Sequence, residues 1–441
     1  MIIDINETTL SSIRNPALHT YAGQYVRIYQ DFVEQIRRTG INFEQQDDTK
    51  QVRERIVALG KKGAIVRNDG KSLYVNRISS ACQACQTAVG SQTFFISLKC
   101  HRNCFFCFNP NQEEYEHYRE ITRDTIAELD ALRANSGRVQ HLALTGGEPL
   151  LHKEETIQFF QHARQIFPNV YMRLYTCGDH LERETLQHFK DAGLNEVRFS
   201  IRIEDTEKAQ RHTYDQIALA REYIPNVMVE MPALPGKMDE MKSVLVELDR
   251  LGVFGINLLE FCYPYHNSDV YNKRGYHIKA RPFRILYNYW YAGGLPVAGS
   301  ETICLDLLAF ALQKGLKLGV HYCSLENKHT GQIYQQNNGY KLPKRTYFSR
   351  KDYFIKTAKV FGEDIAAVKQ LFDKSGYRDY SMSEQHNFLE FHVDKIRSLS
   401  KMNIEVGISS NVIESRDNEQ VLRELKVDVT TPQTFRFSKD I

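Results

Sequence analysis

The sequence predicts an α/β fold with a parallel sheet, because strand-like and helix-like segments alternate through the middle of the chain. Apolar runs such as 170–178 (VYMRLYTCG) and 255–262 (GINLLEFC) have the composition of buried strands. Between such runs, apolar residues recur at helical spacing, as in 156–167 and 241–252. Together these observations favour strand–helix units whose helices lie outside a parallel sheet.

Six strands are expected in this central region, and a further group of elements follows them. The expected strands are 93–99, 139–145, 170–178, 196–203, 227–236 and 255–262. A further strand, helix and strand at 294–300, 302–315 and 318–324 would extend the pattern towards eight strands. The carboxyl ends of parallel strands form the active face in such folds, so residues that follow the strands are the candidates for function.

The flanking regions differ from this central region. Residues 1–80 are expected to form a helical region plus a β-hairpin that turns at Asn68-Asp69-Gly70. Residues 81–326 then form the core, and residues 327–441 form a small α+β extension with a helix at 364–376. The sequence therefore predicts three regions with boundaries near 80 and 326.

Composition excludes several classes of protein. The 57 Lys and Arg residues nearly balance the 54 Asp and Glu residues, which gives no basic footprint for nucleic acid. No window approaches the roughly 18 apolar residues of a membrane span. The beginning MIIDINET has no basic segment followed by an apolar run, so no secretory signal is expected. A cytoplasmic location, with thiols kept reduced, is the resulting expectation.

Three cysteines lie within eight residues in the segment LKCHRNCFFCFNPN: Cys100, Cys104 and Cys107. They could be buried core thiols, disulfide partners or metal ligands. In a reducing compartment, clustered cysteines indicate a metal or catalysis rather than disulfides. Structural zinc usually takes four ligands. Three thiolates can instead hold three irons of a 4Fe–4S cluster and leave the fourth iron open.

This C-x3-C-x2-C segment, with Phe106 before its last cysteine, resembles the signature of radical S-adenosylmethionine (SAM) enzymes. About forty residues later come Gly146, Gly147 and Glu148, which resemble the stretch that binds the SAM amino group in that family. Two glycines also let the backbone approach a ligand closely. The resemblance implies a 4Fe–4S cluster held by the three cysteines. It also implies a partial (βα)6 barrel, with closure towards a TIM-like (βα)8 barrel as the extended form.

The whole chain resembles an uncharacterised group related to pyruvate formate-lyase activating enzymes. The resemblance implies reductive cleavage of SAM to a 5′-deoxyadenosyl radical that abstracts hydrogen from an unidentified substrate. That substrate could be a small molecule, a peptide or a protein, and an electron donor such as flavodoxin or ferredoxin would be a partner. The alternative is a non-catalytic iron–sulfur or zinc protein that uses the same fold for sensing or scaffolding.

Three further residues at expected strand ends are candidates for this site. Ser200 and Arg202 alternate onto one strand face, where the family often contacts the SAM ribose and carboxylate, and a guanidinium suits a carboxylate. Pairing of Arg202 with a neighbouring acidic residue is the structural alternative. Cys177 could donate a hydrogen atom to a substrate radical, although a buried cysteine is ordinarily a small hydrophobic residue.

A second group of potential ligands lies outside the cysteine signature. Cys82 and Cys85 have C-x2-C spacing, while His321 and Cys323 lie two residues apart on one expected strand face. The last strand of a nearly closed barrel lies close to the first, so these four residues could meet. Three thiols and an imidazole could hold zinc or an auxiliary iron–sulfur cluster. The alternative, that these are idle or core thiols, stays open.

Overall fold

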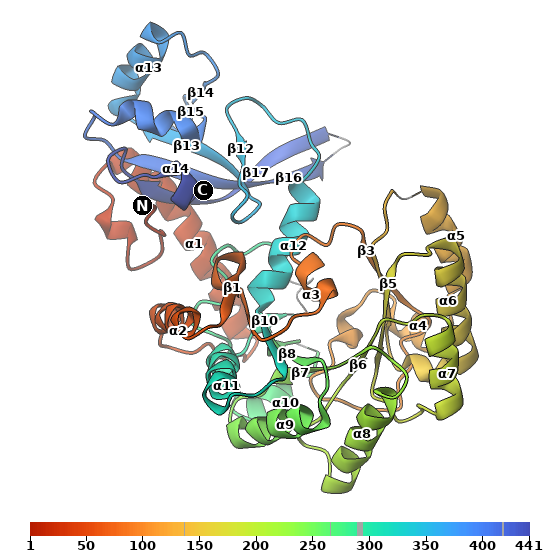
Figure 1. Cartoon of the computed structure of the whole chain (residues 1–441). Helices are drawn as coiled ribbons and strands as arrows, with labels where there is room; N and C mark the ends of the chain where they lie inside the picture. The colour runs from red at the N-terminus through yellow and green to blue at the C-terminus, as the bar shows by residue number, and fades with distance from the viewer. Residues whose placement is uncertain (136, 265, 289–293, 417–418) are drawn as a thin grey trace. The chain divides into compact units, whose positions relative to one another are not determined.

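The computed structural model describes residues 1–135, 137–264, 266–288, 294–416 and 419–441 (Figure 1). The chain forms two compact units. The first comprises Met1–Gly40, Phe283–Asn288 and Gln332–Ile441, and the second comprises Ile41–Pro282 and Tyr289–Gly331. The boundaries of these units differ from the predicted boundaries near residues 80 and 326.

The larger unit is built on a nine-stranded sheet in the order β1-β2-β11-β8-β7-β6-β5-β4-β3. Its strands are β1 (Ile65–Arg67), β2 (Ser72–Val75), β3 (Ser91–Phe95), β4 (His141–Thr145), β5 (Tyr171–Thr176), β6 (Glu196–Phe199), β7 (Asn226–Ala233), β8 (Gly255–Glu260) and β11 (Gly319–Cys323). Neighbouring strands from β3 to β8 are parallel, and β11 is parallel to β8. The α/β fold and the six central strands are therefore confirmed.

Helices connect these strands and bury their apolar faces against the sheet. They are α2 (Thr49–Lys61), α3 (Ser80–Ala84), α4 (Tyr115–Glu120), α5 (Thr125–Asn135), α6 (Lys153–Ile166), α7 (Arg183–Asp191), α8 (Glu207–Ala220), α9 (Met238–Leu251), α10 (Ser268–Lys273), α11 (Ser300–Lys314) and α12 (Leu325–Asn337). Figure 1 shows α5 to α8 along one side of the strands. Phe160 and Ala163 of α6 and Leu245 and Leu248 of α9 are fully buried in the core. These residues lie at the helical spacing expected from the sequence.

The predicted extension is confirmed for helix α11 and for strand β11, which adds a seventh parallel strand, but it is wrong for the strand expected at 294–300 and for closure towards eight strands. Residues 295–296 form β10 (Leu295–Pro296), which pairs antiparallel with β9 (Cys262–Tyr263) outside the main sheet. The edge of β11 is taken by β2 in an antiparallel pairing, so the β1–β2 hairpin ends the sheet. Within the described strands no pairing joins β1 to β3, and no closed barrel forms.

The hairpin turn itself was predicted correctly. Asn68, Asp69 and Gly70 all have positive φ, at 46°, 56° and 88°, and they connect Arg67 to Ser72, which face each other across the hairpin. Asparagine, aspartate and glycine tolerate this left-handed backbone better than other residues.

The smaller unit contains a six-stranded sheet in the order β14-β15-β13-β16-β17, with β12 also pairing β13. Its elements are α1 (Pro16–Arg38), β12 (Tyr347–Phe348), β13 (Ile355–Phe361), α13 (Asp364–Lys374), β14 (Ser381–Ser383), β15 (Phe388–Phe391), β16 (Val406–Arg416), β17 (Glu419–Thr430) and α14 (Phe437–Asp440). Leu18 and Tyr21 of α1 pack against Phe361 and Val427 of this sheet. The N-terminal helix therefore belongs with the C-terminal strands. None of the described helices is long and apolar enough to cross a membrane.

Candidate functional site

The three cysteines of the C-x3-C-x2-C segment occupy a loop, here called the cysteine loop (residues 100–107), that follows β3. Cys100 is exposed, whereas Cys104 and Cys107 are partly buried. The Arg102 N–H donates to Cys100 Sγ over 3.4 Å. Burial raises the pKa of Cys104 to about 11, with Arg202 acting in the opposite direction, and burial also raises the pKa of Cys107. Without a metal these thiols hold their protons, so metal binding would release them.

The cysteine loop is anchored to the residues after β5 by a network of charged groups. Arg102 donates to both carboxylate oxygens of Asp179 at 2.5 and 2.6 Å, and to Asp205 at 2.8 Å. His101 Nε2 lies 2.6 Å from Asp179 Oδ2. Burial opposes ionisation of Asp179, but the hydrogen bonds from Arg102 and His101 outweigh it and hold the pKa of that carboxyl below its ordinary value. No periodic pattern of residues indicates this network in advance.

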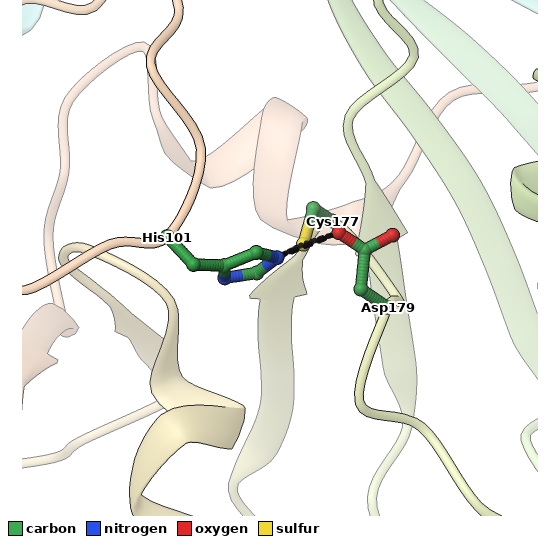
Figure 2. A group of neighbouring side chains, drawn as sticks. All are labelled: His101, Cys177 and Asp179. Carbon is green, nitrogen blue, oxygen red and sulfur yellow. Dashed lines mark hydrogen bonds and ion pairs between the residues drawn. The ribbon is translucent and has the colours of Figure 1, made fainter. Parts of the chain in front are cut away.

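Cys177 lies in the same cluster, as Figure 2 shows. It directly follows β5, as predicted, and its Sγ is 3.4 Å from Asp179 Oδ2 and 3.7 Å from His101 Nε2. Among the described residues, the ligand atoms of His101, Cys177 and Asp179 all lie within 4.8 Å of one another. Burial, followed by the nearby Glu148 carboxylate, raises the pKa of Cys177. Cys177 is therefore a neutral thiol, which is the form that carries a transferable hydrogen.

Gly146 and Gly147 lie directly against the segment that leads into the cysteine loop. Gly147 N–H donates to Ser97 O at 3.0 Å. A Cβ on Gly147 would lie 1.9 Å from Lys99 O, and one on Gly146 would lie 2.5 Å from Ser97 O. Gly146 also has a φ of 115°, which other residues rarely adopt. The glycines are therefore required by the close approach of two protein backbones, a reason that the sequence did not reveal.

Glu148 is buried, with 2% of its surface exposed, and its carboxylate is fully engaged by the protein. Oε1 accepts from Thr176 Oγ1 at 2.6 Å and from Leu150 N–H at 3.1 Å, and Oε2 accepts from Cys177 N–H at 2.7 Å. The Glu148 N–H donates to Lys99 O at 2.8 Å. Glu148 thus ties the ends of β4 and β5 to the segment before the cysteine loop.

Ser200 and Arg202 lie in the loop after β6 rather than on a strand, because β6 ends at Phe199. Ser200 is exposed. Arg202 is partly buried and pairs with Asp205 at 3.3 Å, which is the structural alternative considered for it. Arg202 also acts on the pKa of Cys104, so the structure brings this guanidinium near the cysteine loop.

Phe106 is held in place by a ring contact with Phe105, its neighbour in the cysteine loop. The rings of Phe105 and Phe106 meet edge to face with centroids 5.2 Å apart. Phe105 in turn packs against Tyr271, and Arg274 lies 4.1 Å from the Phe105 ring centroid. This aromatic contact fixes the loop between Cys104 and Cys107.

Residues of β6, β7 and β8 form a buried network of charged and polar groups. Arg198, which is 4% exposed, binds Glu196 at 2.6 Å and Glu230 at 2.7 Å. Asn257 Nδ2 also donates to Glu230, at 2.8 Å. Burial opposes ionisation of the two glutamates, but Arg198 outweighs it and holds the pKa of each below its ordinary value. In the sequence, the available signal for this network was the alternation of charged residues along the expected strands.

His321 is also part of this interior network. Its Nδ1 lies 2.7 Å from Asn257 Oδ1 and its Nε2 lies 2.9 Å from Ser72 Oγ. Burial, followed by Arg198, lowers the pKa of His321 to about 3, so the imidazole is neutral. Both ring nitrogens are engaged, and a metal could bind His321 only by replacing one of these hydrogen bonds.

Comparison with known proteins agrees with this site. Residues 94–248, which include the cysteine loop and the Gly-Gly-Glu segment, match the radical SAM superfamily. The region that holds the candidate site is therefore similar to the radical SAM superfamily. Over 219 residues the chain is 29% identical to a protein of Methanocaldococcus jannaschii whose name describes a glycyl-radical enzyme activating enzyme, covering 46% of this chain and 55% of that protein. The chain therefore spans about half the length of this curated relative.

Other radical SAM proteins match over shorter or more divergent regions. A GTP 3′,8-cyclase of Nautilia profundicola is 31% identical over 107 residues, which are 24% of this chain and 33% of that protein. Among solved structures, Streptococcus suis SuiB bound to the precursor peptide SuiA has a TM-score of 0.40 at 10% identity, covering 72% of this chain and 66% of SuiB. Escherichia coli coproporphyrinogen III oxidase has a TM-score of 0.36 at 16% identity, covering 55% and 58%.

Proposed function

We propose that this protein cleaves S-adenosylmethionine reductively and directs the resulting 5′-deoxyadenosyl radical to a hydrogen atom of a substrate. One observation carries the proposal: the Gly-Gly-Glu segment is joined by backbone hydrogen bonds to Ser97 and Lys99, in the segment that leads from β3 into the cysteine loop. The residues of the two motifs therefore form a single site, although about forty residues separate them in the sequence.

The residues fit a 4Fe–4S cluster. Cys100, Cys104 and Cys107 offer three thiols in one loop, and each of these thiols would bind a different iron. Cys100 and Cys107 both act on the pKa of Cys104, and Cys100 acts on that of Cys107, so the three thiols are neighbours. When bound, the cluster supplies the electron that breaks the sulfonium C–S bond of SAM at its open iron. The chain contributes the binding, orientation and exclusion of water.

The carboxylate of Glu148 acts here as a positioning group. Its two oxygens accept three hydrogen bonds from the protein, so the SAM ammonium would be bound by backbone groups of the Gly146–Glu148 segment. Arg202 would bind the SAM carboxylate, and its action on the pKa of Cys104 supports this role. Asp179 and Arg102 hold the loop in place during this binding.

The substrate is proposed from the relatives. The likeness to a named activating enzyme supports a glycyl site on a partner protein as the target, with a small molecule or free peptide as the alternative. An electron donor such as flavodoxin or ferredoxin would reduce the cluster. Cys177 is the candidate for returning a hydrogen atom to a substrate radical, because its neutral thiol lies beside the cysteine loop.

The experiment that tests the proposal is anaerobic reconstitution with iron and sulfide, followed by addition of SAM and dithionite. We expect 5′-deoxyadenosine in the wild type and none in Cys104→Ala. Cys304→Ala is the matched control, because Cys304 is a fully buried core residue of α11.

A second measurement separates an idle enzyme from a binding protein. SAM should change the electron paramagnetic resonance spectrum of the reduced cluster even if cleavage waits for the substrate. A loaded cluster that neither responds to SAM nor forms 5′-deoxyadenosine would support the alternative of a non-catalytic iron–sulfur protein and overturn the proposal.

A further inference from the structure

Three cysteines outside the cysteine loop come from segments far apart in the sequence. Cys82 lies in α3, Cys85 follows α3, and Cys323 is the last residue of β11. The β2–β11 pairing draws β11 towards the segment before α3. Gly331 of α12 lies against the Cys85 backbone, so closely that a Cβ would sit 2.8 Å from Cys85 O. Figure 1 shows α3 beside α12, which begins two residues after Cys323.

Cys82 and Cys85 both act on the pKa of Cys323. Burial raises the pKa of Cys323 to about 12, and Cys85 is the next largest cause, with Cys82 also contributing in the same direction. Lys328, in α12, acts on Cys323 in the opposite direction, and its own pKa is raised by both Cys323 and Cys85. A lysine therefore faces this group of thiols. We call Cys82, Cys85 and Cys323 the second thiol group.

The two buried sulfur atoms of this group already accept N–H hydrogen bonds. Asn257 Nδ2 and Arg198 Nη2 each donate to Cys82 Sγ at 3.2 Å. Asn327 Nδ2 donates to Cys323 Sγ at 3.3 Å. Donors aimed at sulfur stabilise the thiolate form, and they are the outer partners that tune metal-bound cysteines. An idle core thiol needs no such partners, and none is recorded for the Cys304 sulfur among the described residues.

We propose that Cys82, Cys85 and Cys323 hold an auxiliary iron–sulfur cluster, beside Lys328 and apart from the cysteine loop. The imidazole of His321 is excluded from the ligand set because Ser72 and Asn257 occupy both of its nitrogens. Three thiolates bind three irons of a 4Fe–4S cluster, as in the cysteine loop.

The spread of the sulfur atoms favours a cluster over a single zinc ion. Ligands of a tetrahedral zinc with Zn–S bonds of about 2.3 Å lie roughly 3.8 Å apart. Among the described residues, the three sulfur atoms of the second thiol group are not all within 4.8 Å of one another. The three sulfur atoms of the cysteine loop show the same spread, as expected where each thiolate binds a different iron.

Cys262 connects the two thiol groups. Burial raises its pKa to about 11, and both Lys328 and Cys107 act on it. Lys328 in turn responds to Cys323 and Cys262. A line of neighbouring groups thus runs from the cysteine loop through Cys262 and Lys328 to Cys323.

The test removes the first cluster and asks whether metal remains. The full chain carrying Cys100→Ala, Cys104→Ala and Cys107→Ala is reconstituted anaerobically with iron and sulfide. Iron, acid-labile sulfide and zinc are then measured, with circular dichroism as the check of folding. We expect about half of the wild-type iron and sulfide to remain, because two 4Fe–4S sites would contribute equally. Adding Cys85→Ser should abolish this remainder, and adding Cys304→Ala should leave it unchanged.

Each other outcome overturns a part of the proposal. A folded triple variant without iron and sulfide would show that no second centre exists. Zinc in place of iron and sulfide would refute the iron–sulfur assignment. Iron that persists after Cys85→Ser would refute the ligand set. Because Cys85 is exposed, its replacement should not prevent folding. The readout is metal content, so it does not depend on whether SAM is cleaved.

Discussion

Replacement of Gly147 by alanine tests whether the two motifs form one site. The added methyl group would lie 1.9 Å from Lys99 O, 2.4 Å from Lys99 C and 2.7 Å from Leu98 C. All three atoms belong to the backbone, so no side-chain rotation can relieve the overlap. Overpacking in a well-packed region costs about 1–3 kcal/mol, and a contact of this kind lies at the upper end, at about 3 kcal/mol.

The expected result of Gly147→Ala has a thermal and a spectroscopic component. A loss of about 3 kcal/mol lowers the Tm by roughly 6–12 °C for a unit of this size. The displaced segment contains Lys99, which directly precedes Cys100, so the reduced cluster should lose its spectral response to SAM. Gly137→Ala is the matched control, because a Cβ on Gly137 meets no atom within 4 Å.

Two results would refute this reasoning in different ways. An unchanged Tm in Gly147→Ala would show that the segment does not pack against Lys99 as described. A lowered Tm with a normal response to SAM would show that the backbone contact stabilises the fold without coupling the two motifs. Differential scanning calorimetry and electron paramagnetic resonance of the same preparations distinguish these results.

Three further predictions follow from the buried charged groups. Asp179→Asn should weaken the anchor of Arg102, lower the free energy of unfolding by about 2 kcal/mol and reduce iron retention, whereas Asp191→Asn should do neither. Arg198→Met leaves two buried carboxylates uncompensated and should cost about 3–5 kcal/mol in chemical denaturation, and a loss below 1 kcal/mol would contradict the buried pairing. Burial, followed by Arg173, lowers the pKa of His141 in the folded protein. As the pH drops below about 6.5, His141 takes up a proton in the unfolded chain before it does so in the folded chain. The free energy of unfolding should therefore fall as the pH drops below this value. His141→Gln should flatten this slope, which is at most about 1.4 kcal/mol per pH unit, and an unchanged slope would contradict the assignment.

The central strands could be predicted because local composition determines them, whereas the edges of the sheet depend on distant pairing. Residues 294–300 form an apolar run that has the composition of a strand, but only the short β10 forms there and it pairs with β9. The place beside β8 is taken by β11, and the other edge of β11 pairs with β2, which lies more than 240 residues away in the sequence. No local pattern in β2 indicates which strand it will join.

The candidate site shows a similar division. The cysteine spacing and the Gly-Gly-Glu segment identify the site because they are local motifs. The anchor of Asp179 to Arg102 joins two loops through single charged residues, and such contacts leave no periodic signal in a sequence. Ser200 and Arg202 were placed on a strand because their alternation continues the pattern of β6, but β6 ends at Phe199. The residues expected on a strand face therefore lie in a loop. Arg202 is still part of the candidate site because it lies near Cys104.

The two interpretations of the Gly-Gly-Glu segment can both hold, and the geometry explains how. Backbone that must approach a ligand closely needs glycine, and here the same glycines approach the protein segment that leads to Cys100. The carboxylate of Glu148 accepts the Cys177 N–H, so the same segment also fixes the loop that carries Asp179. Movement of the Gly146–Glu148 backbone would therefore displace Lys99 and Asp179 together. Because these residues flank and anchor the cysteine loop, SAM binding and the geometry of the cluster should change together, which is why a spectral response to SAM is the most direct readout of this site.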